Sequence, residues 1–143
     1  MSKPKTPKIK AEIAKREKAY RLDVPPISWQ RAKLSGNRFY DGQKADKVKC
    51  GLLLLRQHGD EPLFNTACEM FIVFFMPIPA SKKKRNKSNY HSTVPDIDNL
   101  IKFNLDMIRG VIITDDRILS SIKAFKVYDD GEGPRTEFTI KEL

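Results

Sequence analysis

The nine residues "CEMFIVFFM" at positions 68–76 decide the fold of this chain. They form a continuous run of aromatic and β-branched residues that is too short for a typical helix, and Pro77 ends it. Such a run is typical of a central strand that is buried on both faces. We therefore expect residues 68–76 to be the middle strand of a sheet, with the other elements arranged around it.

Two elements are expected before this strand. "ISWQR" and "RFY" flank a Ser-Gly-Asn turn at 35–37, which indicates a β-hairpin or two short extended pieces. The pattern over residues 43–57 predicts a helix that buries a face made of Val48, Leu52 and Leu55.

A long loop and a second helix are expected after the strand. Residues 77–95 contain three prolines and many small polar residues, and loops of that length in a compact domain are usually functional or disordered. The helix signals that follow place Asp98 at the N-cap and Gly110 at the C-terminal end. The expected apolar stripe of this helix consists of Leu100, Ile101, Leu105 and Ile108.

Two further strands complete the pattern. One is expected over 119–128, and "TEFTIK" at 136–141 alternates so that Phe138 and Ile140 share one face. "DDGEGP" at 129–134 predicts a hairpin turn between them. The fold class is therefore α/β of the α+β type, with helices packed on a single mixed β-sheet.

Length and composition indicate one soluble domain. The chain has 143 residues, 40% of them hydrophobic, and no apolar run reaches the roughly 20 residues that span a bilayer. The N-terminus "MSKPKTPKIK" has no apolar segment behind its lysines, so we expect no secretory signal, no membrane and a cytoplasmic location. Cys50 and Cys68 do not form a metal-ligand pattern, and we expect both in the core.

The net charge of +9 is concentrated in two segments. Residues 1–22 carry eight basic residues against two glutamates and are expected to be a flexible basic arm preceding a domain at 23–143; the "AEIAKREKAY" part of this arm has helical character. The segment 81–87 carries five more cations and no acid. These five expected DNA-binding residues are Lys82, Lys83, Lys84, Arg85 and Lys87. Solubility is the alternative role for both segments.

Acidic residues gather around the second helix, in "VPDIDNLIKF" at 94–103 and "TDDR" at 114–117. Asp96 and Asp98 lie on one side if the backbone is extended there, so both can reach one cation. Oxygen ligands without histidine or cysteine suit Mg²⁺ or Mn²⁺. Lys102 lies one helical turn from Asp98, and the second acidic pair joins the site only if the chain doubles back.

Each of these residues also has a purely structural explanation. Asp98 can cap the helix and Asp96 can favour its positive end. The acids of "TDDR" can form a turn, and Lys102 can pair on the helix surface with Asp98 or Asp106. A calcium-binding EF-hand is excluded because the required glycine and glutamate are missing. A serine-histidine-aspartate triad is disfavoured because only His58 and His91 are available.

The stretch "PDIDNLIKFNLDMIRGVIITDDRILSSIKAFKVY" at 95–128 resembles the core of the RusA-like Holliday junction resolvases, which are crossover junction endodeoxyribonucleases of phages and prophages. The likeness covers about residues 24–141 and includes "MPIPASKKKR" and "GEGPRTEFTI". The ordered positions that carry it are Asp96, Asp98, Asn99, Lys102, Asp115 and Asp116.

The resemblance implies a homodimer that cuts four-way DNA junctions and related branched DNA with Mg²⁺, for which Mn²⁺ can substitute, in recombination and repair. It implies that Asp96, Asp98 and Asp116 are metal-binding catalytic acids and that Lys102 is a catalytic lysine. Asp115 is the alternative ligand of its pair. The family can carry an arginine where this chain has Pro95, which leaves that DNA contact to the loop lysines. The alternative function is a branched-DNA-binding protein of the same fold that does not cut.

Overall fold

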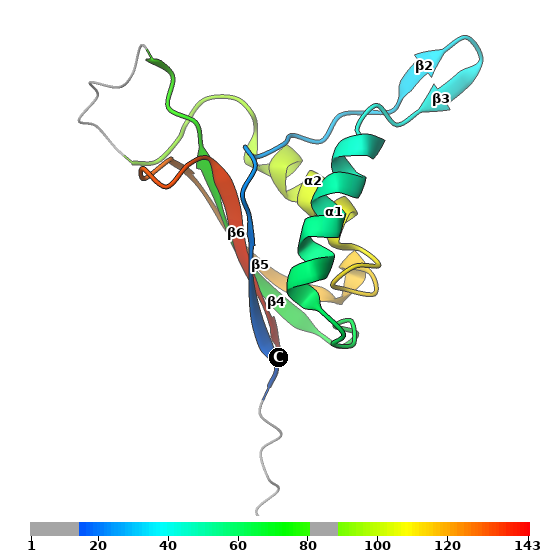
Figure 1. Cartoon of the computed structure of the whole chain (residues 1–143), viewed down its shortest axis with the longest axis vertical. Helices are drawn as coiled ribbons and strands as arrows, with labels where there is room; N and C mark the ends of the chain where they lie inside the picture. The colour runs from blue at the N-terminus through cyan, green and yellow to red at the C-terminus, as the bar shows by residue number, and fades with distance from the viewer. Residues whose placement is uncertain (1–14, 81–88) are drawn as a thin grey trace, which may run out of the picture.

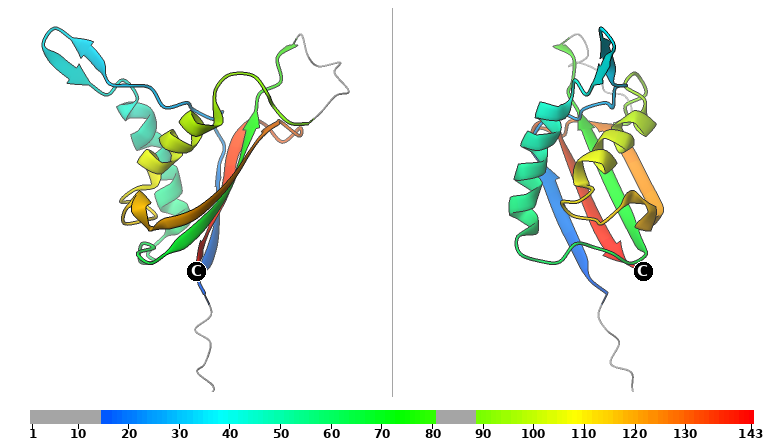
Figure 2. Two further views of the ribbon diagram at one scale, coloured as in Figure 1. Left: turned by 180° about the vertical axis from the view of Figure 1, so that it is seen from behind. Right: turned by 90° about the vertical axis from the view of Figure 1, so that its right-hand side faces the viewer.

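The structure is a computed structural model that describes residues 15–80 and 89–143. Its main sheet has the strand order β1-β6-β4-β5, and both helices lie on one face of that sheet (Figures 1 and 2). The elements of this layer pair are β1 (Glu17–Leu22), β4 (Cys68–Met76), β5 (Leu119–Tyr128), β6 (Arg135–Glu142), α1 (Lys44–His58) and α2 (Ile97–Ile108). The predicted fold class, one mixed sheet with helices packed on it, is confirmed.

A small two-stranded sheet is separate from this body. Strands β2 (Lys33–Ser35) and β3 (Arg38–Tyr40) pair antiparallel around the predicted turn, which confirms the hairpin. The hairpin projects beyond the end of the main sheet at which α2 begins (Figures 1 and 2).

Strand β4 is the centre of the sheet, antiparallel to β6 and parallel to β5. Its alternate residues from Cys68 to Met76 are buried under the helices, but Phe71 is 44% exposed on the other face. The prediction that both faces of β4 are buried is therefore wrong within a single copy of the chain, because both helices pack on the same side of the sheet. The open face contains a hollow of about 420 Å³ lined by β1, β4 and β6, among others by Phe71, Val73 and Thr139.

The segment 129–134 is not a hairpin turn between paired strands, so that prediction is also wrong. Strand β6 pairs with β4 and β1, and β4 lies between β5 and β6. The Asp129 N–H donates to the Met76 carbonyl at 2.8 Å, so the segment passes over the end of β4. The sequence showed two strands and a turn but not the strand inserted between them.

Residues 17–22 form strand β1, so the expected flexible arm at 1–22 is wrong over this range. Tyr20 and Leu22 are buried, Tyr20 contacts His58 of α1, and β1 pairs with β6 along its whole length. The alternation of polar and apolar residues in "EKAYRL" gives the strand one buried side. The domain therefore begins before residue 23, and residues 1–14 lie outside the described residues.

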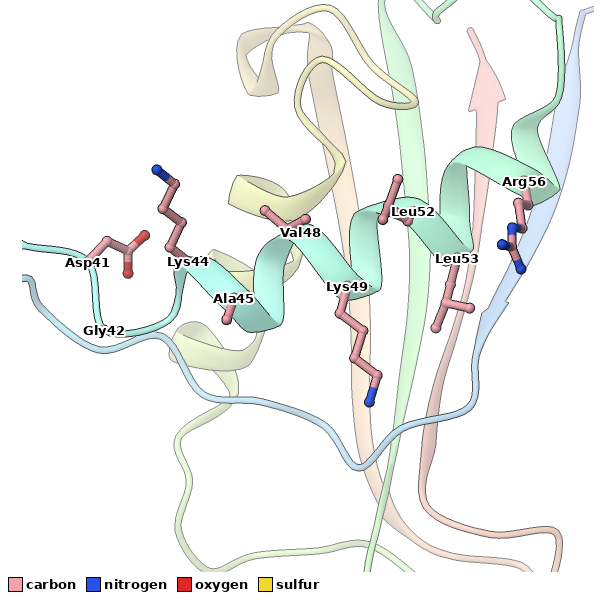
Figure 3. Close-up of a pocket in the computed structure, with 9 residues that line it drawn as sticks. All are labelled: Asp41, Gly42, Lys44, Ala45, Val48, Lys49, Leu52, Leu53 and Arg56. Carbon is pink, nitrogen blue, oxygen red and sulfur yellow. The ribbon is translucent and has the colours of Figure 1, made fainter.

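Helix α1 forms where it was predicted but buries a different face. Val48, Leu52 and Leu55 are 54%, 56% and 47% exposed. The residues buried instead are Cys50, Gly51, Leu54 and His58. Figure 3 shows that Val48 and Leu52 project to the side opposite Lys49, along a shallow hollow of about 870 Å³.

The two cysteines are free and buried, which confirms their prediction as core residues. Within residues 15–80 and 89–143, no helix is long and apolar enough to cross a membrane.

Both edges of the main sheet are partly occupied by other groups. At the β1 edge, the Gln57 side chain accepts a hydrogen bond from the Arg21 N–H (2.8 Å) and donates one to the Arg21 carbonyl (2.5 Å). At the β5 edge, the His91 N–H donates to the Lys126 carbonyl (2.9 Å). A short bridge between Tyr90 and Val127 continues this contact.

A buried arginine anchors the turn between β5 and β6. The Arg135 guanidinium lies 3.7 Å from the centre of the Phe75 ring and is almost fully buried. It pairs with Asp130 at 3.0 Å, with Glu132 at 3.1 Å and with Glu137 at 3.2 Å. The hydrogen bond from Arg135 lowers the pKa of Asp130 to about 2. The side chain thus neutralises an acidic turn and covers part of the open sheet face.

We predict that Arg135→Met lowers the Tm by roughly 5 °C at pH 7, because it leaves these carboxylates without their cation. Asp130 has a lowered pKa in the folded protein, so its contribution is present above its unfolded pKa and is lost as the pH falls towards about 2. The difference in Tm between the two proteins should therefore shrink at pH 2.5 in thermal unfolding.

Arg56→Met is the matched control, since Arg56 is exposed and has no ion pair in the part of the chain that the structure describes. It should leave the Tm unchanged at both pH values. An equal loss of Tm for Arg135→Met at pH 7 and pH 2.5 would mean that packing on Phe75, not charge, is what Arg135 provides.

Candidate active site

Two exposed carboxylates stand at the beginning of α2. The backbone of Asp96 is extended (φ −68°, ψ 141°) and Asp96 takes the N-cap position, so the prediction of Asp98 as N-cap is wrong by two residues. The Asp96 side chain makes no capping hydrogen bond, while Asp98 Oδ1 accepts one from the Asn99 N–H at 2.9 Å. Both carboxylates lie near the positive end of the helix and retain free oxygen atoms.

Two residues that the sequence analysis did not single out fix the position of this helix end. The Lys126 ammonium of β5 donates to the carbonyls of Thr93 and, at 2.6 Å, of Pro95. The Trp29 N–H donates to the Asn99 carbonyl at 2.9 Å. The sequence feature that could have indicated Lys126 is the alternation of side chains along β5, which places Lys126 on the face of the sheet that the helices cover.

Lys102 lies one turn further along α2 and is exposed. Its Nζ is 4.1 Å from the centre of the Trp29 ring, a cation–π contact. In the described part of the chain it forms no ion pair with Asp98 or Asp106. Asp106 pairs instead with Lys47 at 3.6 Å. The expected surface pair is thus not formed, and the ammonium lies against the Trp29 ring instead.

Asp115 and Asp116 have different surroundings. Asp115 caps a short 3-10 turn by accepting from the Arg117 N–H at 3.1 Å, and this hydrogen bond lowers the pKa of Asp115. A hydrogen bond with Asp115 raises the pKa of Asp116, because it favours the protonated carboxyl. Asp115 therefore has a structural role in the turn, and its hydrogen bond with Asp116 favours the protonated form of the Asp116 carboxyl.

The two acidic pairs lie at opposite ends of α2. The helix has 12 residues and is about 18 Å long. After it, the chain pairs with Phe64, whose N–H donates to the Ile112 carbonyl and whose carbonyl accepts from the Thr114 N–H. The chain thus does not return to the start of α2. Among the described residues, no three acidic, histidine or cysteine side chains are grouped to hold a metal ion.

His58 lies in the core and away from the acidic residues of the candidate site. His58 is buried, with its Nδ1 2.7 Å from the Tyr20 hydroxyl and its Nε2 3.1 Å from the Pro62 carbonyl. Burial raises the pKa of Tyr20. His58 is therefore part of the core.

The predicted DNA-binding residues Lys82, Lys83, Lys84, Arg85 and Lys87 lie outside the described residues.

Comparisons with known proteins show the family of the chain. The family model described as "Endodeoxyribonuclease RusA" matches residues 23–141, a range that begins just after β1. The chain is also similar to a protein of Bacillus subtilis (strain 168), named as the uncharacterized protein YqaN. The two are 31% identical over 99 residues, which is 64% of this chain and 68% of that protein. The chain belongs to the RusA endodeoxyribonuclease family.

Proposed function

We propose that this chain is a Mg²⁺-dependent endodeoxyribonuclease that resolves four-way DNA junctions and related branched DNA as a homodimer. Family membership supports nuclease chemistry, and the observation that carries the rest is the pair Asp96 and Asp98 at the start of α2. These carboxylates are exposed, unpaired with any cationic side chain in the described residues, and accompanied by the lysine at position 102.

The donor set fits a hard divalent cation. Asp96 keeps both carboxylate oxygens free, and Asp98 uses one for a backbone hydrogen bond. Mg²⁺ binds proteins through one or two carboxylates and takes its remaining ligands from water and substrate phosphates. A cation held there would supply Lewis-acid activation and neutralise charge at the scissile phosphate. Mn²⁺ shares this preference for oxygen ligands.

The chain's own residues would act around that phosphate. Asp96 and Asp98 would orient the cation against the helix end. The Lys102 ammonium would reach the phosphate, either by leaving the Trp29 ring or while still in contact with it. It would stabilise the negative charge that develops on the reacting oxygen atoms. The hydrogen bond from the Lys126 ammonium to the Pro95 carbonyl supports this proposal, because it holds the backbone just before Asp96.

A homodimer is supported by the separation of the two acidic pairs, because Asp116 does not reach the Asp96–Asp98 pair of its own chain. A two-fold axis across α2 would bring Asp116 of one copy towards the Asp96–Asp98 pair of the other. We propose that Asp116 completes the site in this way. Basic residues 82–87 would bind backbone phosphates.

One experiment tests the function. A labelled four-way junction should be nicked symmetrically by the wild-type protein with Mg²⁺ and left intact with EDTA. Asp98→Asn should abolish cleavage while keeping or tightening junction binding, because it removes a metal ligand and relieves repulsion of the phosphate. Gel analysis gives cleavage, and fluorescence anisotropy gives binding.

Asp106→Asn is the matched control, a carboxylate on the same helix that pairs with Lys47, and it should cut at the wild-type rate. Binding of the junction without nicking by the wild-type protein, whatever the cation, would favour the non-cutting branched-DNA-binding alternative.

A second prediction concerns Lys102. Lys102→Met should leave folding and junction binding nearly unchanged but slow the chemical step by about 10²-fold, the scale on which single preorganised charges act. Lys102→Arg should restore only part of the rate, because a planar guanidinium places its charge differently. Single-turnover cleavage of a saturated junction isolates this step. A normal rate for Lys102→Met would remove Lys102 from the catalytic residues.

A third prediction concerns the proposed sharing of the site between two copies of the chain. Asp98→Asn and Asp116→Asn homodimers should both be inactive. After the two proteins exchange subunits, each heterodimer has one site with both changes and one intact site, so nicking should recover to about a quarter of the wild-type site number. A mixture that stays inactive would place Asp116 in the site of its own chain, and an active Asp116→Asn homodimer would assign the third ligand to Asp115.

A further inference from the structure

The β2–β3 hairpin exposes apolar side chains to an unusual degree. Leu34 is 62% exposed and Phe39 is 75% exposed, and the two lie directly opposite each other across the pair of strands. A two-residue turn at Gly36-Asn37 connects the strands, with Gly36 at φ 61°, a value suited to a tight hairpin. An apolar pair on so small an element contributes to no core, so its exposure points to a ligand.

The hairpin has two chemically different faces. Side chains alternate along a strand, so Lys33 and Arg38 lie on the face opposite Leu34 and Phe39. Residues 24–40 contain three cations and no acid. In the described part of the chain, neither Lys33 nor Arg38 forms an ion pair. One face therefore suits phosphate groups and the other suits an apolar or aromatic surface.

The base of the hairpin is fastened to the proposed site. The Gln43 side chain accepts from the Gln30 N–H at 2.9 Å and donates to the Ser28 carbonyl at 2.7 Å. Trp29, between these two residues, is bonded to the first turn of α2 and lies under the Lys102 ammonium. The hairpin therefore extends from the helix end that carries the carboxylate pair.

We propose that the β2–β3 hairpin is a second DNA-binding element that enters the opening between the arms of branched DNA. Phe39, supported by Leu34, stacks on base planes exposed at the branch point, and Lys33 and Arg38 bind phosphates of the neighbouring arm. The proposal rests on the proposed function, because it takes the substrate to be DNA.

The two-sided chemistry selects the branch point over a linear duplex. In a continuous duplex the base planes are stacked on each other and only their edges are reachable from the grooves. Where arms meet, base planes end beside phosphate backbones, so a thin element can contact both at once. Aromatic rings stack on such bases without reading their sequence. The positive hairpin also complements the charge of DNA, which an apolar protein partner does not require.

Binding in EDTA to a four-way junction and to a linear duplex of the same length tests the proposal without cleavage. Phe39→Ala should raise the Kd for the junction by about 10-fold and leave the Kd for the duplex unchanged. Phe39→Trp, which keeps an aromatic ring at this position, should bind the junction with a Kd close to that of the wild-type protein. The Lys33→Ala/Arg38→Ala double variant should weaken binding to both DNAs and reduce the salt slope by about 2.

Leu52→Ala is the matched control, since Leu52 is a comparably exposed apolar residue of α1, outside the hairpin. It should bind both DNAs as the wild-type protein does. A 2-aminopurine base placed at the branch point should be quenched by the wild-type protein and not by Phe39→Ala, which reports stacking directly.

Equal junction binding by Phe39→Ala and the wild-type protein would overturn the proposal. So would a lower oligomeric state of Phe39→Ala in sedimentation, which would assign Leu34 and Phe39 to a contact between copies of the chain. The outcomes separate from those for the proposed function. If the wild-type protein cuts junctions and the Phe39→Ala variant binds them normally, only the DNA-binding role of the hairpin is refuted. If Phe39→Ala weakens junction binding but the wild-type protein never cuts, only the nuclease function is refuted.

Discussion

The parallel pairing of β4 with β5 is the constraint on which the rest of the structure depends. Two parallel neighbours cannot be joined by a tight turn, so the chain returns along the sheet before β5 begins, and α2 forms part of that return. The start of α2 is therefore near the end of β4, and the end of α2 is near the start of β5. This one pairing places the carboxylate pair and the Asp115–Asp116 pair a helix length apart.

The sequence predicts the elements well where the local signals are strong. The bounds of β4 follow from an apolar run, and the predicted range of β5 agrees with the structure. Helix α2 follows from a clear apolar stripe before Gly110, although its N-cap was predicted two residues too late, at Asp98. The fold class follows from their order. The carboxylates and Lys102 could also be found from the sequence, because residues at the start of one helix are necessarily close in space. Trp29 could not, since it reaches the site through tertiary contacts, and the alternation of β5 gives the face on which Lys126 lies but not its contact with Pro95.

The sequence does not decide which faces are buried when both are apolar. In α1, four consecutive leucines at 52–55 fit several helical phases, and the packing against β1 and α2 selects Leu54. In β4, Phe71 and Phe75 are as apolar as their buried neighbours, so the sequence does not show that their face of the sheet is left uncovered. Strand β1 was not predicted because its charged residues Lys18 and Arg21 are equally typical of a solvent-exposed arm.

The occupied sheet edges limit how this protein can self-associate. Bare strand edges are the usual starting point for domain exchange and fibril growth, because their peptide groups accept any new strand. Here a glutamine side chain imitates a neighbouring strand at one edge, and the segment at 89–91 does so at the other. Contact between copies through these edges is thereby disfavoured, and any association would use side-chain surfaces, whose complementarity is more specific than backbone pairing.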